Sequence, residues 1–504
     1  MNNLNSLRNL IKKLSGEEMK ILFRILQPQK ESKNKLENKS LLLVNLLLVE
    51  PSLSSNEIQK KIYESLNYSA FNKLCSRLRE KALDSLLMDS SIENGGYSKR
   101  NEIVFELKKK LIQADILNLK GLRDQADAIC KKIIVVSSEY EIYDLIIQSL
   151  ITREKFVRIR KNKKELSKII NDIKVTNDKY ESFRLCQSEF NSIMNKISTA
   201  GNEMSYYVEL EKAILSLEIE FTKYNSNSTG YFLQLLKTQM YQNKNDFNKA
   251  DESLEVAMKM LKKKSVYSDN RMGSVLLSKA ENYIKLRNFD DSIMFSEEAS
   301  NYFPNNIFNK ALVHEYKFYA NFFSGELKKS KINLDYLCKL PEENNTILSI
   351  NKWKFLTAAL MFIENKFSDC LNCLLQVSEI DKDKEGWNVN IRILSILCRI
   401  ELFETDSVDL NVQNLEKFLK RISKTSNVPT RYQIILRILV SLLNEGYDFN
   451  KVSIKKKKSL TILEEINEKS SWNIKGPELI PFHIWFKNKV ENPGPLYSKI
   501  ISSI

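Results

Sequence analysis

Apolar residues recur every three or four positions along most of the chain, and this spacing predicts amphipathic helices. The first helix is expected at the start of the chain, where the apolar positions are Leu4, Leu7, Leu10, Ile11 and Leu14. Two capping boxes follow, because a serine and a glutamate three residues apart can bind each other's backbone amides. They are Ser15 with Glu18 and Ser54 with Glu57. A long helix is expected from Ser69 to Asp89, and we expect an all-α protein.

The clearest structural unit runs from Gly273 to Asn306, where small and aromatic residues recur at helical spacing. Small side chains leave room for two helices to pack closely, and aromatic side chains fill the space beside them. The small residues are Ala280, Ser292 and Ala299, and the aromatic residues are Tyr283 and Phe289. Pro304 disfavours a further helical turn and so ends the second helix. The segment therefore predicts an antiparallel helix hairpin.

This hairpin resembles the tetratricopeptide repeat (TPR), whose helix pairs stack into a superhelix. The residues that carry the resemblance are Leu276, Ala280, Tyr283, Phe289, Ser292, Ala299 and Pro304. Similar sets occur upstream at Tyr241, Phe247, Ala250, Leu254 and Ala257, and downstream at Phe318, Gly325, Leu327, Ser330, Leu334 and Leu337. The period of about 40 residues is longer than the about 34 of the strict repeat, which leaves a generic α-solenoid open. The resemblance implies an α-solenoid of antiparallel helix hairpins that forms a TPR-like right-handed superhelix.

Four segments are expected along the chain. Residues 1–100 form an N-terminal helical module, 101–200 the first repeat-like hairpins, 201–445 the TPR-like solenoid and 446–504 a C-terminal capping segment. The first boundary follows Asn94, Gly95 and Gly96, the sharpest break in the helical pattern. Aromatic residues and prolines concentrate beyond Lys451, and they predict an element that covers the last hairpin's exposed core.

The basic excess of the chain does not by itself predict a nucleic-acid partner. The formal net charge is +15 over 504 residues, and residues of both signs are mixed along most helices. Basic residues concentrate in two runs, Arg153–Lys164 and Lys455–Lys458. Each run could contact phosphates or an acidic partner, or could lie exposed between helices, and the second interpretation is favoured.

The residues that usually carry catalysis or bind metals are few and scattered. Seven cysteines without framework spacing indicate free thiols in a reducing compartment. Cys370 and Cys373 form a C-x-x-C pair inside a predicted helix, without a second ligand pair, and the two histidines, His314 and His483, are far apart. Glycine-rich phosphate-binding motifs do not occur. We therefore expect no catalytic residues, no metal site, no cofactor and no enzymatic activity.

Two helices of the N-terminal module are joined by a short polar turn, as in a helix-turn-helix. The basic residues of the second helix that could contact nucleic acid are Lys73, Arg77, Arg79 and Lys81. The turn contains no glycine, the second helix is about twice the usual length of a recognition helix, and Glu80 and Asp84 reduce its charge. An N-terminal capping bundle is therefore favoured over DNA binding.

The family resemblance implies that the first helices of successive repeats line a groove that binds a partner. The inward positions of the three best copies are Gln239 and Asn243, Glu281 and Lys285, and Tyr319 and Phe323. Asparagine and lysine can hold an extended backbone, and tyrosine and phenylalanine offer apolar contact at low cost in side-chain entropy. The mixed character of these residues does not match the family's basic clamp for a C-terminal carboxylate.

The expected function is that of a cytoplasmic scaffold that binds a peptide or protein segment in this groove. No targeting signal opens the chain, and its longest apolar run, Leu41–Val49, is far shorter than the roughly 20 residues that cross a membrane. No membrane partner is therefore expected. The alternative is a TPR-containing regulator with a DNA-binding N-terminal module, and nucleic acid is the less favoured partner.

Overall fold

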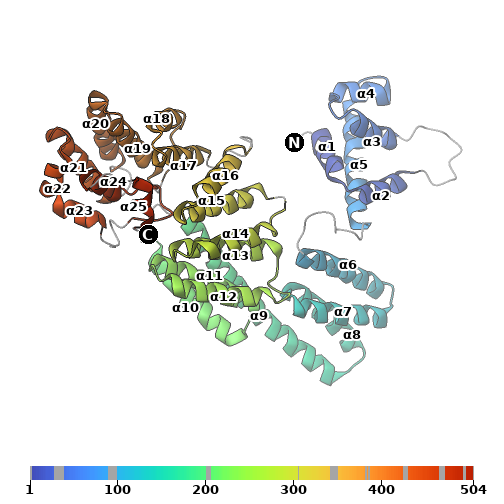
Figure 1. The fold of residues 1–504 in the computed structure, drawn as a ribbon. Helices are drawn as coiled ribbons and strands as arrows, with labels where there is room; N and C mark the ends of the chain where they lie inside the picture. Colours follow the sequence, from blue (N-terminus) through green and yellow to red (C-terminus); the bar gives the residue numbers. More distant parts are fainter. Residues whose placement is uncertain are drawn as a thin grey trace. The chain divides into compact units, whose positions relative to one another are not determined.

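The structure is a computed structural model, and it describes residues 3–27, 39–88, 99–199, 206–304, 306–340, 350–380, 383, 386–423, 430–464, 472–491 and 495–502. These residues form 25 helices, α1 to α25, and no strand (Figure 1). The expected all-α fold is therefore confirmed. The chain divides into two compact units, residues 1–177 and 178–504. Asn94–Gly96 lie outside the described residues, and the four predicted segments stay predictions.

The first unit begins with a helical module in which α5 packs against α1, α2 and α3. Both predicted capping boxes form, at the start of α2 and of α4. The core contains apolar positions of the sequence pattern, among them Leu7, Leu22 and Leu78, which have no exposed surface. The first eight helices of the chain are α1 (Asn3–Lys13), α2 (Gly16–Leu26), α3 (Lys39–Val49), α4 (Ser55–Tyr63), α5 (Tyr68–Met88), α6 (Lys99–Leu119), α7 (Arg123–Glu139) and α8 (Tyr143–Ile159).

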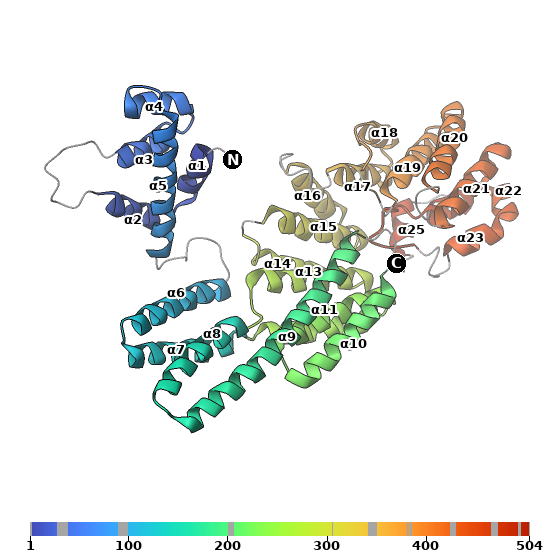
Figure 2. The same ribbon diagram turned by 180° about the vertical axis from the view of Figure 1, so that it is seen from behind.

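Helix α9 (Lys163–Thr199) is the longest of the described helices, at 37 residues. The division between the two units falls inside it, between Asn177 and Asp178. Figure 2 shows it as one continuous helix. Within residues 101–200, which were expected to form the first repeat-like hairpins, α9 is one uninterrupted helix.

The second unit is built from consecutive helices that pack against their neighbours in sequence, as in an α-solenoid. Its repeat-like helices are α10 (Tyr207–Tyr224), α11 (Asn227–Asn243), α12 (Phe247–Leu261), α13 (Asp269–Lys285), α14 (Phe289–Ser300), α15 (Ile307–Phe323), α16 (Leu327–Cys338), α17 (Ile350–Ile363), α18 (Phe367–Leu375), α19 (Trp387–Glu401), α20 (Thr405–Ile422) and α21 (Thr430–Asn444). The C-terminal helices are α22 (Phe449–Lys455), α23 (Lys457–Glu464), α24 (Phe482–Val490) and α25 (Leu496–Ser502).

The hairpin turns share one backbone conformation. In the turn between α13 and α14, Arg287 has a φ of 61°, and the next amide, of Asn288, donates to the Tyr283 carbonyl at 3.0 Å. This bond closes the end of the helix as in a Schellman motif. The same pair of features recurs in other turns of both units, with positive φ at Gly121, Glu141, Asn245, Gly325, Asn365, Phe403 and Gly446. The repetition supports the description of these hairpins as copies of one unit.

Helices α13 and α14 meet at the small residues that predicted the hairpin. Ala280 and Ser292 have no exposed surface, and the Ser292 hydroxyl donates to the Ala280 carbonyl at 2.8 Å. Gly273, at the other end of α13, lies against the ring of Phe303, where an added Cβ would be 2.4 Å from Cζ. Small residues therefore permit the close approach of these elements.

Replacing Ala280 with leucine is expected to lower the free energy of unfolding by about 1–3 kcal/mol, because the larger side chain overfills the contact between α13 and α14. Chemical denaturation of the full chain measures the effect. The matched control is Ser274→Leu on the exposed face of the same helix, which should change stability by less than about 0.5 kcal/mol. Equal effects of the two substitutions would show that Ala280 does not lie at a close contact.

Candidate functional site

The candidate site is the face formed by α11, α13, α15, α17 and α19, the first helices of the hairpins, which we call the inner face. At its α11 end, Gln239 and Asn243 are partly exposed. The Gln239 side chain donates to Asn243 Oδ1 at 2.8 Å, and Asn243 donates to the Tyr206 hydroxyl at 3.3 Å. The two predicted residues therefore lie side by side on α11 and bond to each other.

Glu281 and Lys285 lie one turn apart on α13, and both are partly exposed. Glu281 accepts from the Tyr316 hydroxyl at 3.0 Å and forms an ion pair with Lys475 at 2.7 Å. The Lys285 ammonium donates to the Asn473 side chain. The two predicted residues on α13 thus contact the chain's own C-terminal part.

Tyr319 and Phe323 lie on α15 and are buried, with 0% and 1% of their surface exposed. The Phe323 ring packs edge-on against the Trp472 ring, with centroids 5.7 Å apart. Phe289 of α14 stacks on Phe323 at 6.3 Å. Their role in partner binding stays a prediction, but in this structure neither side chain presents an open apolar surface.

Residues 472–481, which we call the C-terminal strap, connect these contacts. The strap contains no helix. Its Pro477, Leu479 and Ile480 line a small void together with residues of α17 and α19, namely Phe355, Ala359, Asn390, Ile393, Leu394 and Leu397. The strap therefore crosses the inner face from α13 and α15 to α17 and α19. Sequence reasoning assigned this part of the chain to the end of the stack and did not place it on the inner face.

The strap is anchored at its far end by Glu478, which is 7% exposed. Arg431 of α21, 5% exposed, donates to both Glu478 carboxylate oxygens, at 2.5 and 2.9 Å. The same carboxylate accepts from the Phe482 amide at 2.7 Å, at the start of α24. Arg431 also bonds to the Leu463 carbonyl and to His483 Nδ1. The carboxylate thus joins the strap, α21 and α24 through one buried group.

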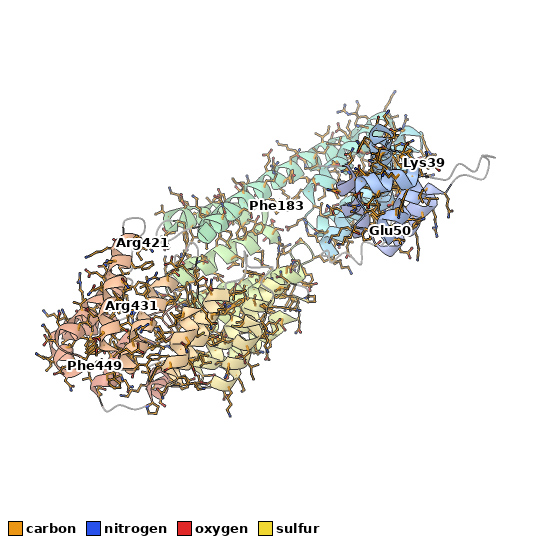
Figure 3. The ribbon with its side chains drawn as sticks, turned by 90° about the horizontal axis from the view of Figure 1, so that it is seen from above. Lys39, Glu50, Phe183, Arg421, Arg431 and Phe449 are labelled. Atoms are coloured by element: carbon orange, nitrogen blue, oxygen red, sulfur yellow. The ribbon has the colours of Figure 1, made fainter. Side chains whose placement is uncertain are left out.

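Helices α24 and α25 hold the chain beyond the strap against the same hairpins. Trp485 of α24 donates to Glu401 of α19 at 2.7 Å, and its ring packs against Phe449 of α22. Tyr497 of α25 donates to the Phe322 carbonyl of α15. Figure 1 shows α24 and α25 among the last hairpins, and Figure 3 shows Arg431 and Phe449 at the same end of this unit. Both ends of the strap are therefore fixed to the solenoid.

The strap and α13 carry opposite charges where they meet. Burial alone would raise the pKa of Glu281, but the ammonium groups of Lys475 and Lys285 and the Tyr316 hydroxyl hold that pKa at about 2. The carboxylate is therefore ionised at any physiological pH. The Lys475 ammonium also lies 4.2 Å from the centroid of the Tyr316 ring, where the ring's negative face attracts a cation.

Comparison with protein-family models finds no match for the chain. Comparison with curated proteins finds no significant relative. The resemblance to TPR proteins therefore depends on residue spacing, and it stays a prediction. The helices of the described ranges include none with the length and apolar character of a membrane span.

The basic residues predicted for nucleic-acid contact, Lys73, Arg77, Arg79 and Lys81, are all exposed on α5. Three of them, Lys73, Arg77 and Lys81, are four residues apart and share one face of the helix. Among the described residues, none of the four forms an ion pair. The turn before α5 is held by Gln59, which accepts from the Asn67 amide at 3.1 Å.

The two basic runs are partly neutralised by neighbouring carboxylates. Arg153 pairs with Asp127 and Glu165, at 2.7 and 2.9 Å. Arg160 pairs with Asp124. In the second run, Lys455 pairs with Glu445 at 2.6 Å. These contacts favour a structural role for the paired residues over phosphate binding.

The cysteines are all free, and most are buried. Cys370 of the C-x-x-C pair is close to Cys398 of α19, with sulfur atoms 3.2 Å apart. Cys373 instead donates to the Lys354 carbonyl. Among the described residues, no group of three or more histidine, cysteine, aspartate or glutamate side chains is placed to hold a metal ion.

Proposed function

We propose that the protein is an interaction scaffold that binds a peptide or a segment of a partner protein on the inner face of its solenoid. The observation that supports this proposal is the strap itself. Its residues 472–475 lie on the inner face and contact Glu281, Lys285 and Phe323, three of the positions that the family resemblance predicted. A face that holds one non-helical segment by charge and aromatic contact has the chemistry to bind another. We assign the function to the cytoplasm, because the seven cysteines are free thiols.

The test is affinity capture from native lysate with three forms of the full chain. The first is wild type, and the second is the inner-face variant Glu281→Gln/Lys285→Ala. The third, Glu298→Gln/Lys331→Ala, makes the same changes at exposed residues of the second helices α14 and α16. Partners of the inner face should be captured by the first and third forms and lost with the second. An identical set of captured proteins for all three forms would refute the proposal.

A second candidate function is DNA binding by the N-terminal module. The row Lys73, Arg77 and Lys81 favours it, because these exposed cations follow one face of the second helix of a helix pair. Gel-shift titration of the full chain at two salt concentrations tests it against Lys73→Ala/Arg77→Ala/Lys81→Ala. DNA binding predicts a shift for wild type that weakens with salt and is reduced in the variant. No salt-sensitive shift at micromolar protein removes this candidate.

A further inference from the structure

The two halves of the strap are held in different ways. In the second half, Glu478, Leu479, Ile480 and Pro481 are buried and continue into α24. In the first half, Asn473 is exposed and Trp472 is only partly buried, whereas Ile474 is buried. The ion pair of this half is also partly open to solvent, since the side chains of Lys475 and Glu281 are 16% and 35% exposed. The first half is therefore more open to solvent than the second, and the Trp472 indole joins the two halves by donating to the Glu478 carbonyl at 2.7 Å.

We propose that the inner face of α13 and α15 is a recognition site for an aromatic residue followed three positions later by a lysine, and that residues 472–475 occupy it as an internal ligand. The partner would present the same pattern in a segment with the same turn and displace these residues while Glu478 stays bound. The proposal rests on the proposed function, and it specifies the chemistry of the segment that the inner face binds.

Each element of the pattern has a matching group on the solenoid. The aromatic ring is received edge-on by Phe323. The lysine is received by the ionised carboxylate of Glu281 and by the face of the Tyr316 ring. Ammonium, carboxylate and ring together select a cation over a neutral side chain.

The residue directly after the aromatic residue and the residue directly after the lysine also contribute to recognition. Lys285 donates to the Asn473 side chain, so a polar acceptor directly after the aromatic residue is preferred. Behind the lysine, the Gly476 amide donates to the Asn473 carbonyl at 2.8 Å, and an added Cβ on Gly476 would lie 3.0 Å from that oxygen. A glycine after the lysine therefore permits the turn that aligns both side chains with their receptors.

An internal ligand lowers the apparent affinity for any external one. A segment tethered by a short connection acts at an effective concentration of the order of millimolar. If the strap's own dissociation constant for this site is about 100 μM, a partner segment would bind wild type about tenfold more weakly than a chain whose strap cannot compete. Substitutions in the strap should consequently strengthen binding, whereas substitutions in the receiving residues should weaken it.

The experiment measures the fluorescence anisotropy of a labelled peptide with the sequence of residues 472–477, titrated with the full chain. The strap variant Trp472→Ala/Lys475→Ala is expected to bind this peptide about tenfold more tightly than wild type. Adding Glu281→Gln to the strap variant should weaken binding about tenfold, the loss of one charged contact. A peptide with alanine at the tryptophan and lysine positions should not bind. The matched control Lys487→Ala, at an exposed lysine of α24, should bind as wild type does.

Three results would overturn the proposal. The first is equal binding by wild type and the strap variant, and the second is no binding by a folded variant up to about 1 mM peptide, the scale of the weakest specific complexes. The third is that wild type forms a dimer and the strap variant does not, because the strap of a second copy would then occupy the inner face. Thermal unfolding checks the fold, and the single variant Lys475→Ala replaces the double variant if that variant unfolds. Peptide binding together with lysate capture that is insensitive to Glu281→Gln/Lys285→Ala would refute only the proposed function.

Discussion

Replacing Arg431 with methionine is expected to lower the free energy of unfolding by about 3–5 kcal/mol, the largest single effect predicted here. The substitution leaves the Glu478 carboxylate almost fully buried without its guanidinium partner, and the Phe482 amide still donates to it. A buried charge without its partner costs far more than the pair contributes when intact. Chemical denaturation of the full chain measures the change.

A second substitution separates the cost of the buried charge from the loss of packing. Arg431→Met/Glu478→Gln removes both charges, and the glutamine carbonyl can still accept from the Phe482 amide. The double variant should therefore regain a large part of the stability that Arg431→Met loses. If the double variant is as unstable as Arg431→Met alone, the loss comes from the shape of the arginine side chain and not from the unpaired carboxylate.

Stability is expected to fall by about 2–3 kcal/mol between about pH 6.5 and pH 4 because of His483. Burial and the adjacent Arg431 guanidinium lower the pKa of His483 from 6.5 to about 4. Arg431 donates to Nδ1 of this ring at 3.1 Å, which requires an unprotonated Nδ1. Below pH 6.5 the unfolded chain therefore binds a proton that the folded chain does not. Stability is complete above pH 6.5, and it is lost as the pH falls toward 4.

Denaturation series at several pH values, on wild type and on His483→Gln, measure this contribution. Glutamine is neutral throughout this range and can accept from Arg431, so the variant should lose most of the pH dependence between pH 6.5 and 4. The matched control is His314→Gln, at the other histidine, whose pKa is also lowered by burial. A His483→Gln variant with the wild-type pH dependence would show that His483 does not carry it.

Both predictions concern residues that fix the strap to the solenoid, and the strap occupies part of the inner face. The C-terminal segment was expected to cover the end of the stack, and this stays a prediction; within the segment, α24 packs against α22 and α23. The strap also occupies the inner face as far back as α13, which is the surface that the family resemblance assigned to a partner. Any partner of that surface must therefore compete with the chain itself.

The fold followed from local signals. The capping boxes at Ser15 and Ser54 and the close contact of Ala280 with Ser292 are present as the spacing predicted. The hairpin turns were harder to recognise, because positive φ occurs at residues such as Arg287 and Phe403 as well as at glycines. Left-handed backbone is unusual for such residues, so the residue types did not predict the turn.

The repeat pattern was enough to choose the positions on α13 and α15, but it did not predict whether their side chains are exposed or buried. Spacing predicts which residues lie on one face of a helix, and it does not predict what covers that face. Tyr319 and Phe323 were expected to offer apolar surface to a partner, and they are buried. The tryptophan that contacts Phe323 lies in a strap without helical periodicity, so no spacing rule connected the two residues.

The sequence by itself determined that this protein is a series of helix hairpins, because helix formation and close packing within a hairpin depend on residues a few positions apart. Only the tertiary structure decided what occupies the inner face. That outcome depends on contacts such as the one between Lys285 and Asn473, which are 188 residues apart. Charge complementarity and burial bring such residues together only after the hairpins have stacked, and no local pattern records the pairing.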